Sequence, residues 1–313
     1  MQKSFIRVRN GLRRALYRQR IRFGLVAERP ELPEEHFARL KSVCIFLGPY
    51  RNLTTLTAAL LSLHPRCQVL NHSGFHILEE DQLNFFKNSS PAIFRKFLQY
   101  IVTESQRGTA GDDGGSITLS HAFRSVPMRE AYGARFGDEL YKSDAECFVW
   151  KESLAVSNYL RAQNVPIDGL LARNQHVRFL LPIRNPMDCA ISNVRTGHGK
   201  RFDQVQRQDF RDVLKAVVRE IDWFHRLSRA YPDRFFSFCE YEVDASLLAS
   251  LAEFLSIEAD PRWIRDALHC YDVKASYDHS AEHVAELQRL IDDHFADDAE
   301  FAGRLKKFLP VDS

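Results

Sequence analysis

Two short segments of this chain carry residue types that bind phosphate. The first is residues 48–55, with the sequence GPYRNLTT, which follow an apolar stretch and precede a helical pattern. Backbone N–H groups at such a strand-to-helix junction, together with the helix N-terminus, attract an anion. A Walker A loop would need glycine and lysine where Leu53 and Thr54 stand, which disfavours ATP and GTP as ligands.

The second segment joins an arginine at the end of a predicted strand to a serine in the following helix. Arg184 follows the apolar residues 177–183, Pro186 suits a helix start, and Ser192 lies one to two helical turns further. The guanidinium group of Arg184 is forked and permanently charged, and Ser192 can face the same anion. The alternative is a structural arginine that caps the sheet.

In order and spacing the two segments resemble the nucleotide-dependent sulfotransferases, whose donor is 3′-phosphoadenosine 5′-phosphosulfate (PAPS). Residues 48–55 are similar to the family's phosphosulfate loop, roughly G-x-x-[RK]-[ST]-G-T-T, and residues 180–192 to its strand, R-[DN]-P and serine. Weaker similarities at residues 150–160 and 238–255 extend the match over about residues 40–257. Leu53 departs from the family's glycine, whose backbone freedom a leucine lacks.

The resemblance implies a set of nucleotide contacts. Arg51 would contact the 5′-phosphate and the bridging oxygen, and Arg184 and Ser192 would hold the 3′-phosphate. Thr54 and Thr55 would bond phosphate oxygens. The expected nucleotide-binding residues are Gly48, Tyr50, Arg51, Asn52, Leu53, Thr54, Thr55, Arg184 and Ser192.

Sulfuryl transfer, like phosphoryl transfer, needs an in-line nucleophile and a stabilised leaving phosphate, with little covalent help from the protein. Arg51 would neutralise charge on the leaving phosphate. Lys151, at the end of another predicted strand, would reach the transferring group. We expect no metal ion, because the sequence shows no set of ligands with suitable spacing.

The acceptor also needs a base, and three places in the sequence compete for this role. His72 follows the second predicted strand, where tyrosyl-type members carry a glutamate. Glu79 and Glu80 resemble a stretch of heparan-type members, and His121 is similar to the strand-end histidine of cytosolic members. We favour His72, because it follows a strand at the expected distance and histidine titrates near neutral pH.

The elements that must position these residues are short apolar stretches separated by helical patterns. They predict an α/β fold in three layers, with a mainly parallel sheet and helices on both faces, and the resemblance implies the P-loop NTPase-like sulfotransferase fold. Residues 54–63 and 78–105 are expected to be helical. The expected strands are residues 43–47, 67–70, 117–119, 147–150, 177–183 and 235–239.

Composition allows one large domain and disfavours nucleic-acid partners, since the 313 residues carry a net charge of only +2. The six cysteines are scattered and predict buried free thiols in a reducing compartment, and hence a cytoplasmic location. No stretch is apolar enough to cross a bilayer. An acidic group near the C-terminus predicts a solvated helix face: Asp292, Asp293, Asp297, Asp298 and Glu300.

Residues 1–34 form a separate basic segment, and residues 35–313 form the expected sulfotransferase-like domain. The basic segment has no acid before Glu28 and interleaves arginine with apolar residues. It could lie on an anionic membrane surface or an acidic partner, and an organelle-targeting peptide would look similar. The alternative is a solvated helix packed on the domain.

We therefore expect a sulfotransferase that moves a sulfuryl group from PAPS to a hydroxyl or amine of a glycan, lipid or small molecule. Loops at residues 72–145 and 193–212 would choose the acceptor. Two alternatives remain: a P-loop kinase-like phosphotransferase, which would need Mg²⁺, and an inactive nucleotide-binding or scaffold protein of the same fold. The expectation depends on Arg51 and Arg184 converging on opposite ends of one adenosine bisphosphate.

Overall fold

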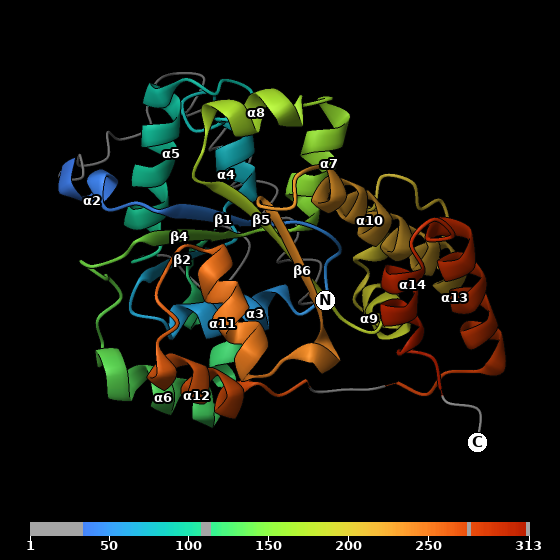
Figure 1. Ribbon diagram of the computed structural model, residues 1–313. Coiled ribbons are helices and arrows are strands. Elements are labelled where there is room, and N and C mark those ends of the chain that lie inside the picture. Colours follow the sequence, from blue (N-terminus) through green and yellow to red (C-terminus); the bar gives the residue numbers. More distant parts are fainter. Residues whose placement is uncertain (1–33, 108–113, 274–276, 311–313) are drawn as a thin grey trace, which may run out of the picture. The chain divides into compact units, whose positions relative to one another are not determined.

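A six-stranded sheet with helices on both faces forms the centre of residues 34–107, 114–273 and 277–310, which the computed structural model describes (Figure 1). The strands are β1 (Ser42–Phe46), β2 (Cys67–Asn71), β3 (Gly115–Ser116), β4 (Cys147–Lys151), β5 (Val177–Ile183) and β6 (Phe235–Cys239). Their order is β3-β2-β4-β1-β5-β6, and each pairing is parallel except that of β2 with β3. The predicted α/β fold with a mainly parallel sheet is confirmed.

Helices cover the sheet on both sides. Helices α3, α6, α11 and α12 share one apolar cluster on one face, and α4, α5, α7 and α8 lie on the other (Figure 1). The helices are α2 (Glu34–Ala38), α3 (Thr54–Ser62), α4 (Gly74–Glu79), α5 (Pro91–Glu104), α6 (Val126–Phe136), α7 (Leu154–Ala162), α8 (Ile167–Arg173), α9 (Pro186–Thr196), α10 (Phe210–Ala230), α11 (Ala245–Phe254), α12 (Pro261–Cys270), α13 (Ala281–His294) and α14 (Ala299–Lys306). Short 3₁₀ helices are η1 (Ile117–Leu119), η2 (His121–Arg124), η3 (Gly199–Arg201) and η4 (Glu240–Glu242).

The central strands are buried along their whole length. Every residue of β1, β2 and β4 is buried, as expected for strands covered on both faces, and this explains their continuous apolar sequences. On the face of α10, the rings of Phe179 and Phe235 stack with their centroids 4.8 Å apart, and Phe224 packs edge-on against Phe235 at 5.3 Å. Aromatic packing therefore joins α10 to β5 and β6.

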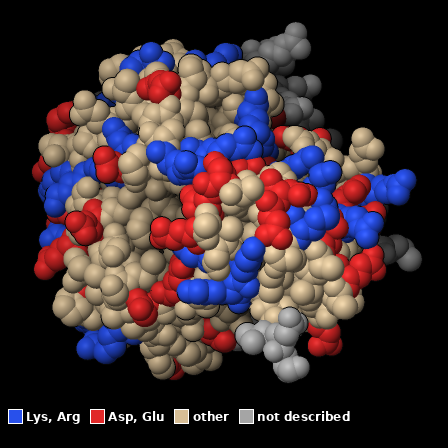
Figure 2. Space-filling view, turned by 45° about the vertical axis from the view of Figure 1, so that its right-hand side comes forward, with Lys and Arg blue, Asp and Glu red and all other residues tan. Residues whose placement is uncertain are grey.

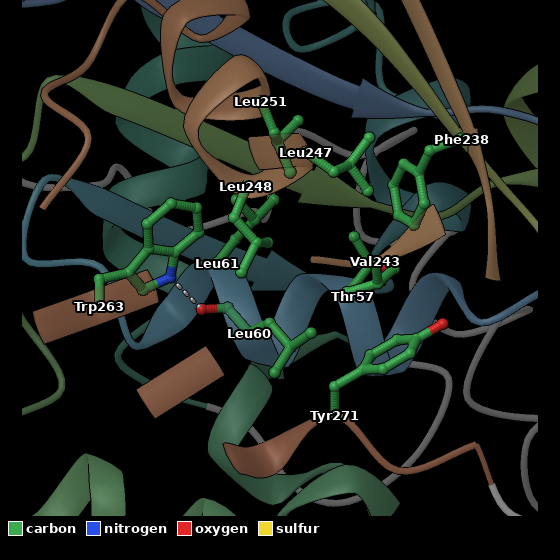
Figure 3. Close-up of a pocket in the computed structure, with 10 residues that line it drawn as sticks. All are labelled: Thr57, Leu60, Leu61, Phe238, Val243, Leu247, Leu248, Leu251, Trp263 and Tyr271. Atoms are coloured by element: carbon green, nitrogen blue, oxygen red, sulfur yellow. Dashed lines mark hydrogen bonds between the residues drawn. The ribbon is translucent and has the colours of Figure 1, made fainter. Parts of the chain in front are cut away.

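Helix α3 is fixed by apolar side chains of α11, α12 and the end of β6 (Figure 3). Trp263 Nε1 donates a hydrogen bond of 2.8 Å to the carbonyl oxygen of Leu60. Thr57, Phe238 and Tyr271 are among the residues that line a cavity of about 10 Å³ here, which is room for about one water molecule. The cavity is too small for a substrate, and the surrounding contacts hold the helix that begins at the phosphate loop.

The strand order places a topological switch point between β1 and β5. From β1 the chain crosses to β2 on one side, whereas from β5 it crosses to β6 on the other. Ligands of open α/β sheets bind outside the carboxyl ends of the strands at such a point. Residues 47–53 follow β1 and residues 184–185 follow β5, so the two segments expected to bind phosphate flank the switch point.

One predicted helix, residues 78–105, is wrong in part. Helix α4 ends at Glu79, and α5 begins only at Pro91. Pro91 occupies the first helical turn, and Ser90 Oγ accepts a hydrogen bond from the N–H of Ile93, which together define a new helix start. Asn84 Nδ2 holds the intervening turn by donating to the carbonyl oxygen of Leu78 at 2.7 Å.

The strand predicted at residues 117–119 is also wrong. These residues form the 3₁₀ helix η1, whose first turn is capped by Ser116 Oγ accepting from the N–H of Thr118 at 3.3 Å. Strand β3 is limited to the two residues that precede η1 and pairs with the end of β2. The local serine cap therefore outweighs the apolar character of Ile117 and Leu119.

The acidic group near the C-terminus is the solvated face that the sequence predicts. Basic and acidic side chains are interspersed on the side that carries α13 and α14 (Figure 2). The pairs include Asp292 with Lys306 at 2.7 Å, Asp293 with Arg289 at 2.5 Å and Asp297 with Arg229 at 2.9 Å. Exposed pairs of this kind contribute about 0–1 kcal/mol each to the free energy of unfolding, so they add little to the stability of this solvated face.

Two further predictions concern cysteines and membranes. All six cysteines are buried and free, as predicted. Within the described residues, no helix has both the length and the apolar composition needed to cross a bilayer. The basic segment predicted for residues 1–34 lies outside the described residues, apart from Glu34.

Candidate functional site

The phosphate loop begins at Gly48, where the backbone conformation and the close neighbours allow only glycine. Gly48 has φ of 90°, and a Cβ atom there would lie 2.2 Å from Leu181 Cδ1. Its N–H donates to Ser157 Oγ in α7 at 2.9 Å. Gly48 therefore shapes the turn after β1, and its N–H group is already used within the protein.

The rest of the loop presents backbone donors. Among the described residues, the N–H groups of residues 51–55 have no hydrogen-bond acceptor, and they surround the N-terminus of α3. Leu53 caps this helix with φ of 60° and ψ of 4°, the left-handed conformation that glycine adopts easily. Such a conformation costs a leucine about 1–2 kcal/mol. The loop thus adopts the left-handed turn although leucine stands in place of glycine, and its N–H groups can bind an anion.

The side chain of Asn52 points into the protein, while its backbone N–H belongs to the loop. Its side chain is fully buried, and its Nδ2 donates to the carbonyl oxygen of Pro182. Its Oδ1 accepts from the N–H of Arg184 at 2.9 Å. Asn52 therefore joins the loop after β1 to the end of β5, and these bonds use both polar atoms of its side chain.

The two segments that the sequence analysis expects to bind phosphate meet directly. Arg51 Nε donates a hydrogen bond of 2.9 Å to Ser192 Oγ in α9. From the same helix, Asn193 Nδ2 donates to the carbonyl oxygen of Tyr50 at 2.7 Å. The segments lie about 140 residues apart in the sequence, and the sheet brings Arg51 and Ser192 to one place.

Arg184 is buried and forms an ion pair with a carboxylate. Its guanidinium Nη2 donates to Asp188 Oδ2 at 3.2 Å, in the first turn of α9. Asp188 Oδ1 accepts from the N–H of Tyr277 at 3.1 Å and from His279 Nε2 at 3.0 Å. The Tyr277 ring lies 5.9 Å from Arg184 Cζ. Arg184 therefore stands at the end of β5, and through Asp188 it ties α9 to residues 277–279.

The residues around Arg184 include two carboxylates that the sequence analysis did not single out. The i, i+4 spacing of Arg184 and Asp188 is the signal that could have found the first. Glu240, after β6, accepts from the N–H of Asn185 at 3.0 Å, and burial raises the pKa of its carboxyl group. Its partner lies 55 residues earlier, so no local pattern reveals it.

Glu152 is a further acid that connects three strand ends. Its Oε1 accepts from Tyr50 Oη at 3.3 Å, and its Oε2 accepts from the N–H of Gly74 at 2.9 Å. A Cβ atom on Gly74 would lie 2.7 Å from this carboxylate. Burial raises the pKa of Tyr50, and the charge of Glu152 adds to the effect, so Tyr50 stays a neutral donor.

Five basic side chains gather in front of these strand ends, and we call them the cationic cluster: Arg51, His72, His121, Arg124 and Lys151. Burial lowers the pKa of His72 well below its usual value, and the charges of Lys151 and His121 lower it further. Burial also lowers the pKa of His121, followed by the charges of Arg51, Lys151 and Arg124. The cluster is therefore an anion-attracting site whose imidazoles are neutral at pH 7.

Backbone strain is concentrated at the same edge of the sheet. Among the described residues, seven positions other than glycine have positive φ. Five of them follow β1, β2 or β4: Arg51, Leu53, His72, Ser73 and Ser153. Each such residue costs about 1–3 kcal/mol, and strain of this kind clusters at functional sites. The carboxyl edge of the sheet is thus marked by strain as well as by charge.

The three candidate bases lie in different surroundings. His72 and His121 belong to the cationic cluster. Glu79 ends α4 and is exposed, whereas Glu80 is buried, and neither is among the groups with the largest effect on the pKa of the two histidines. The part of the chain that the structure describes contains no group of three His, Cys, Asp or Glu side chains that could hold a metal ion.

Comparison with known proteins gives little beyond this geometry. No protein-family model and no curated protein matches the chain. Among solved structures, it is similar to the sulfotransferase domain from the Synechococcus PCC 7002 olefin synthase, with 14% sequence identity and a TM-score of 0.37. The match covers 92% of this chain and 91% of that one. A similarity of this size carries no argument about function, so the geometry must carry it.

Proposed function

We propose that this chain is a sulfotransferase that moves a sulfuryl group from PAPS to a hydroxyl or amine of an acceptor. The observation that carries the proposal is the hydrogen bond from Arg51 to Ser192, which unites two segments that each resemble one phosphate site of the family. Asn52 fixes the same two segments from the inside through Arg184 and Pro182. A nucleotide with phosphates at both ends of its ribose suits two linked anion sites of this kind.

The chain's own residues have distinct roles in this reaction. The N–H groups of residues 51–55 and the N-terminus of α3 hold the 5′-phosphate, and Arg51 neutralises it as it leaves. Lys151 faces the transferring group from the end of β4. The acceptor oxygen forms a bond to sulfur while the bond from sulfur to the 5′-phosphate oxygen breaks, and the phosphate keeps that electron pair.

His72 is the base that takes the acceptor's proton. It is neutral at pH 7, because burial and neighbouring cations lower its pKa. A neutral imidazole accepts a proton, and the phosphates of a bound nucleotide would offset the neighbouring cations and raise its pKa toward neutrality. The bound donor thus supplies the sulfuryl group and also raises the basicity of His72.

The binding of adenosine 3′,5′-bisphosphate, measured by calorimetry, tests the proposal. We expect Arg51→Ala and Arg184→Ala each to weaken binding about tenfold or more, since each removes a charge-assisted hydrogen bond to phosphate. A matched control is Arg178→Ala, at the opposite end of β5, where Arg178 Nε donates to the carbonyl oxygen of Phe254. This variant should bind as the parent does.

Because Arg184 is buried, its alanine variant can also lose stability. Arg184→Lys keeps the charge but loses the forked geometry, so we expect a folded protein with an intermediate loss of affinity. Parent protein that binds no adenosine 3′,5′-bisphosphate would refute the proposal. Equal binding by the parent and by folded Arg51→Ala and Arg184→Lys would also refute it.

A further inference from the structure

The cationic cluster contains more basic side chains than the donor requires, and this inference rests on the proposed function. The proposed donor uses Arg51 at its 5′-phosphate and Lys151 at its sulfuryl group. His121 and Arg124 remain, and both belong to η2, which packs against α3, the helix that follows the phosphate loop. Their charges act on the same site, because Arg124, Arg51 and Lys151 all lower the pKa of His121 after burial.

These remaining basic side chains have no acidic partner within the described residues. Arg51, His121 and Arg124 form no ion pair with a described carboxylate, and the side-chain hydrogen bond of Arg51 goes to the neutral Ser192. Like charges that face one another without a counter-charge favour the binding of an anion.

The η2 turn holds these side chains in fixed positions. Phe123, between His121 and Arg124 in sequence, is buried and packs edge-on against Tyr132, with 5.5 Å between ring centroids. Arg129 Nη1 donates to the carbonyl oxygens of Phe123 and Arg124 at 3.1 and 2.9 Å. The side chains of His121 and Arg124 are exposed on this anchored turn and can reach a ligand from solvent.

We propose that the acceptor is itself an anion, and that Arg124 and His121 bind its carboxylate, sulfate or phosphate group while its hydroxyl or amine faces His72. This assignment makes His121 a binding residue and leaves His72 as the base. It narrows the acceptor from any hydroxyl compound to an acidic one. Guanidinium and imidazolium groups form charge-assisted hydrogen bonds with each of the three anions.

Inorganic sulfate, titrated into protein saturated with PAPS at constant ionic strength, tests this inference. Saturation fills the sites of the phosphates and the sulfuryl group, so further sulfate binding reports the acceptor's anion site. NMR of the His121 ring, identified with His121→Gln, follows binding. We expect sulfate to raise the pKa of His121, because an adjacent anion stabilises the imidazolium. Arg124→Ala should weaken sulfate binding about tenfold.

Two control variants separate local from general charge effects. Arg124→Lys should recover part of the lost affinity, whereas Lys215→Ala, which removes an exposed charge from α10, should bind sulfate as the parent does. Arg124→Ala should change the affinity for adenosine 3′,5′-bisphosphate less than about threefold. Absent sulfate binding, or binding that Arg124→Ala leaves unchanged, overturns the inference.

The two proposals fail in different ways. If the protein binds PAPS but no further sulfate, the inference alone is wrong. Failure of the proposed function appears as a protein that binds neither PAPS nor adenosine 3′,5′-bisphosphate, and the inference then falls with it. A protein that binds PAPS and then sulfate through Arg124 supports both.

Discussion

Histidine and lysine occur together at both ends of the sheet, in very different surroundings. At the amino ends of the strands, Lys142 Nζ donates to the carbonyl oxygens of Ser62, His64 and Cys67. His64 Nε2 donates to the carbonyl oxygen of Glu258 at 2.8 Å, and His64 Nδ1 accepts from the N–H of Arg66 at 3.0 Å. At the carboxyl ends, the positive charges of Lys151 and His121 instead act on His72.

The comparison shows that a perturbed pKa does not by itself identify a functional site. Burial lowers the pKa of Lys142 to about 7 and that of His64 to about 4, and it lowers that of His72 as well. What differs is the partner. Backbone carbonyls satisfy Lys142 and His64 and fix the end of α3, whereas like charges around His72 leave the site ready for an anion.

The largest expected effect comes from removing the amino-end lysine. We expect Lys142→Met to lower the free energy of unfolding by on the order of 3 kcal/mol, because it leaves three carbonyl oxygens without their donor in the core. Lys151→Met should lower it less, because the charge of Lys151 also disfavours positive charge on the neighbouring His72 and His121. Chemical denaturation at pH 7 measures both.

In ligand binding, we expect the larger effect from Lys151→Met and the smaller one from Lys142→Met. Lys151→Met should reduce the affinity for PAPS more than that for adenosine 3′,5′-bisphosphate, because Lys151 is proposed to contact the sulfuryl group. Lys142→Met should leave the ratio of the two affinities unchanged. Equal destabilisation by both variants would break the comparison between the two ends.

The next largest effect is a pH dependence from His64. Its pKa is about 4 in the folded protein and about 6.5 in the unfolded chain, so the unfolded chain binds more protons between these values. Stability should therefore fall as pH falls from 6.5 to 4, by about 3 kcal/mol in total from this group. Denaturation series should show a shallower decline for His64→Gln, whose stability deficit at pH 7 shrinks in acid. A constant deficit would contradict the assignment.

Much of the sheet and of the loop positions could be predicted from the sequence. Buried parallel strands need continuous apolar residues. Arg184 follows β5 directly, and Arg51 lies in the loop that follows β1. The departure at Leu53 was also readable, because a loop of this shape needs a left-handed residue there. These features depend on neighbours within one strand, loop or helix.

The partners of the site residues could not be predicted in the same way. Arg184 is held by Asp188, which in turn binds residues 277–279 from a distant part of the chain. Arg124 gives no sequence signal at all, since exposed arginines are common and only the fold brings this one to His121. The direction of Asn52 into the protein also depends on where β5 ends.

The smallest expected effect concerns strain, which occurs both at the site and away from it. Leu53, at the site, and Ser256, beyond the end of α11, both have positive φ. Leu53→Gly and Ser256→Gly should each raise the free energy of unfolding by about 0.5–1 kcal/mol, because glycine adopts this conformation without the steric cost. Leu53→Ala keeps the strain and loses packing, so it should be less stable than Leu53→Gly. Thermal denaturation measures the order of the two Leu53 variants. If Leu53→Ala is the more stable, side-chain packing rather than backbone strain determines the stability of the loop, and the positive φ of Leu53 does not mark a strained site.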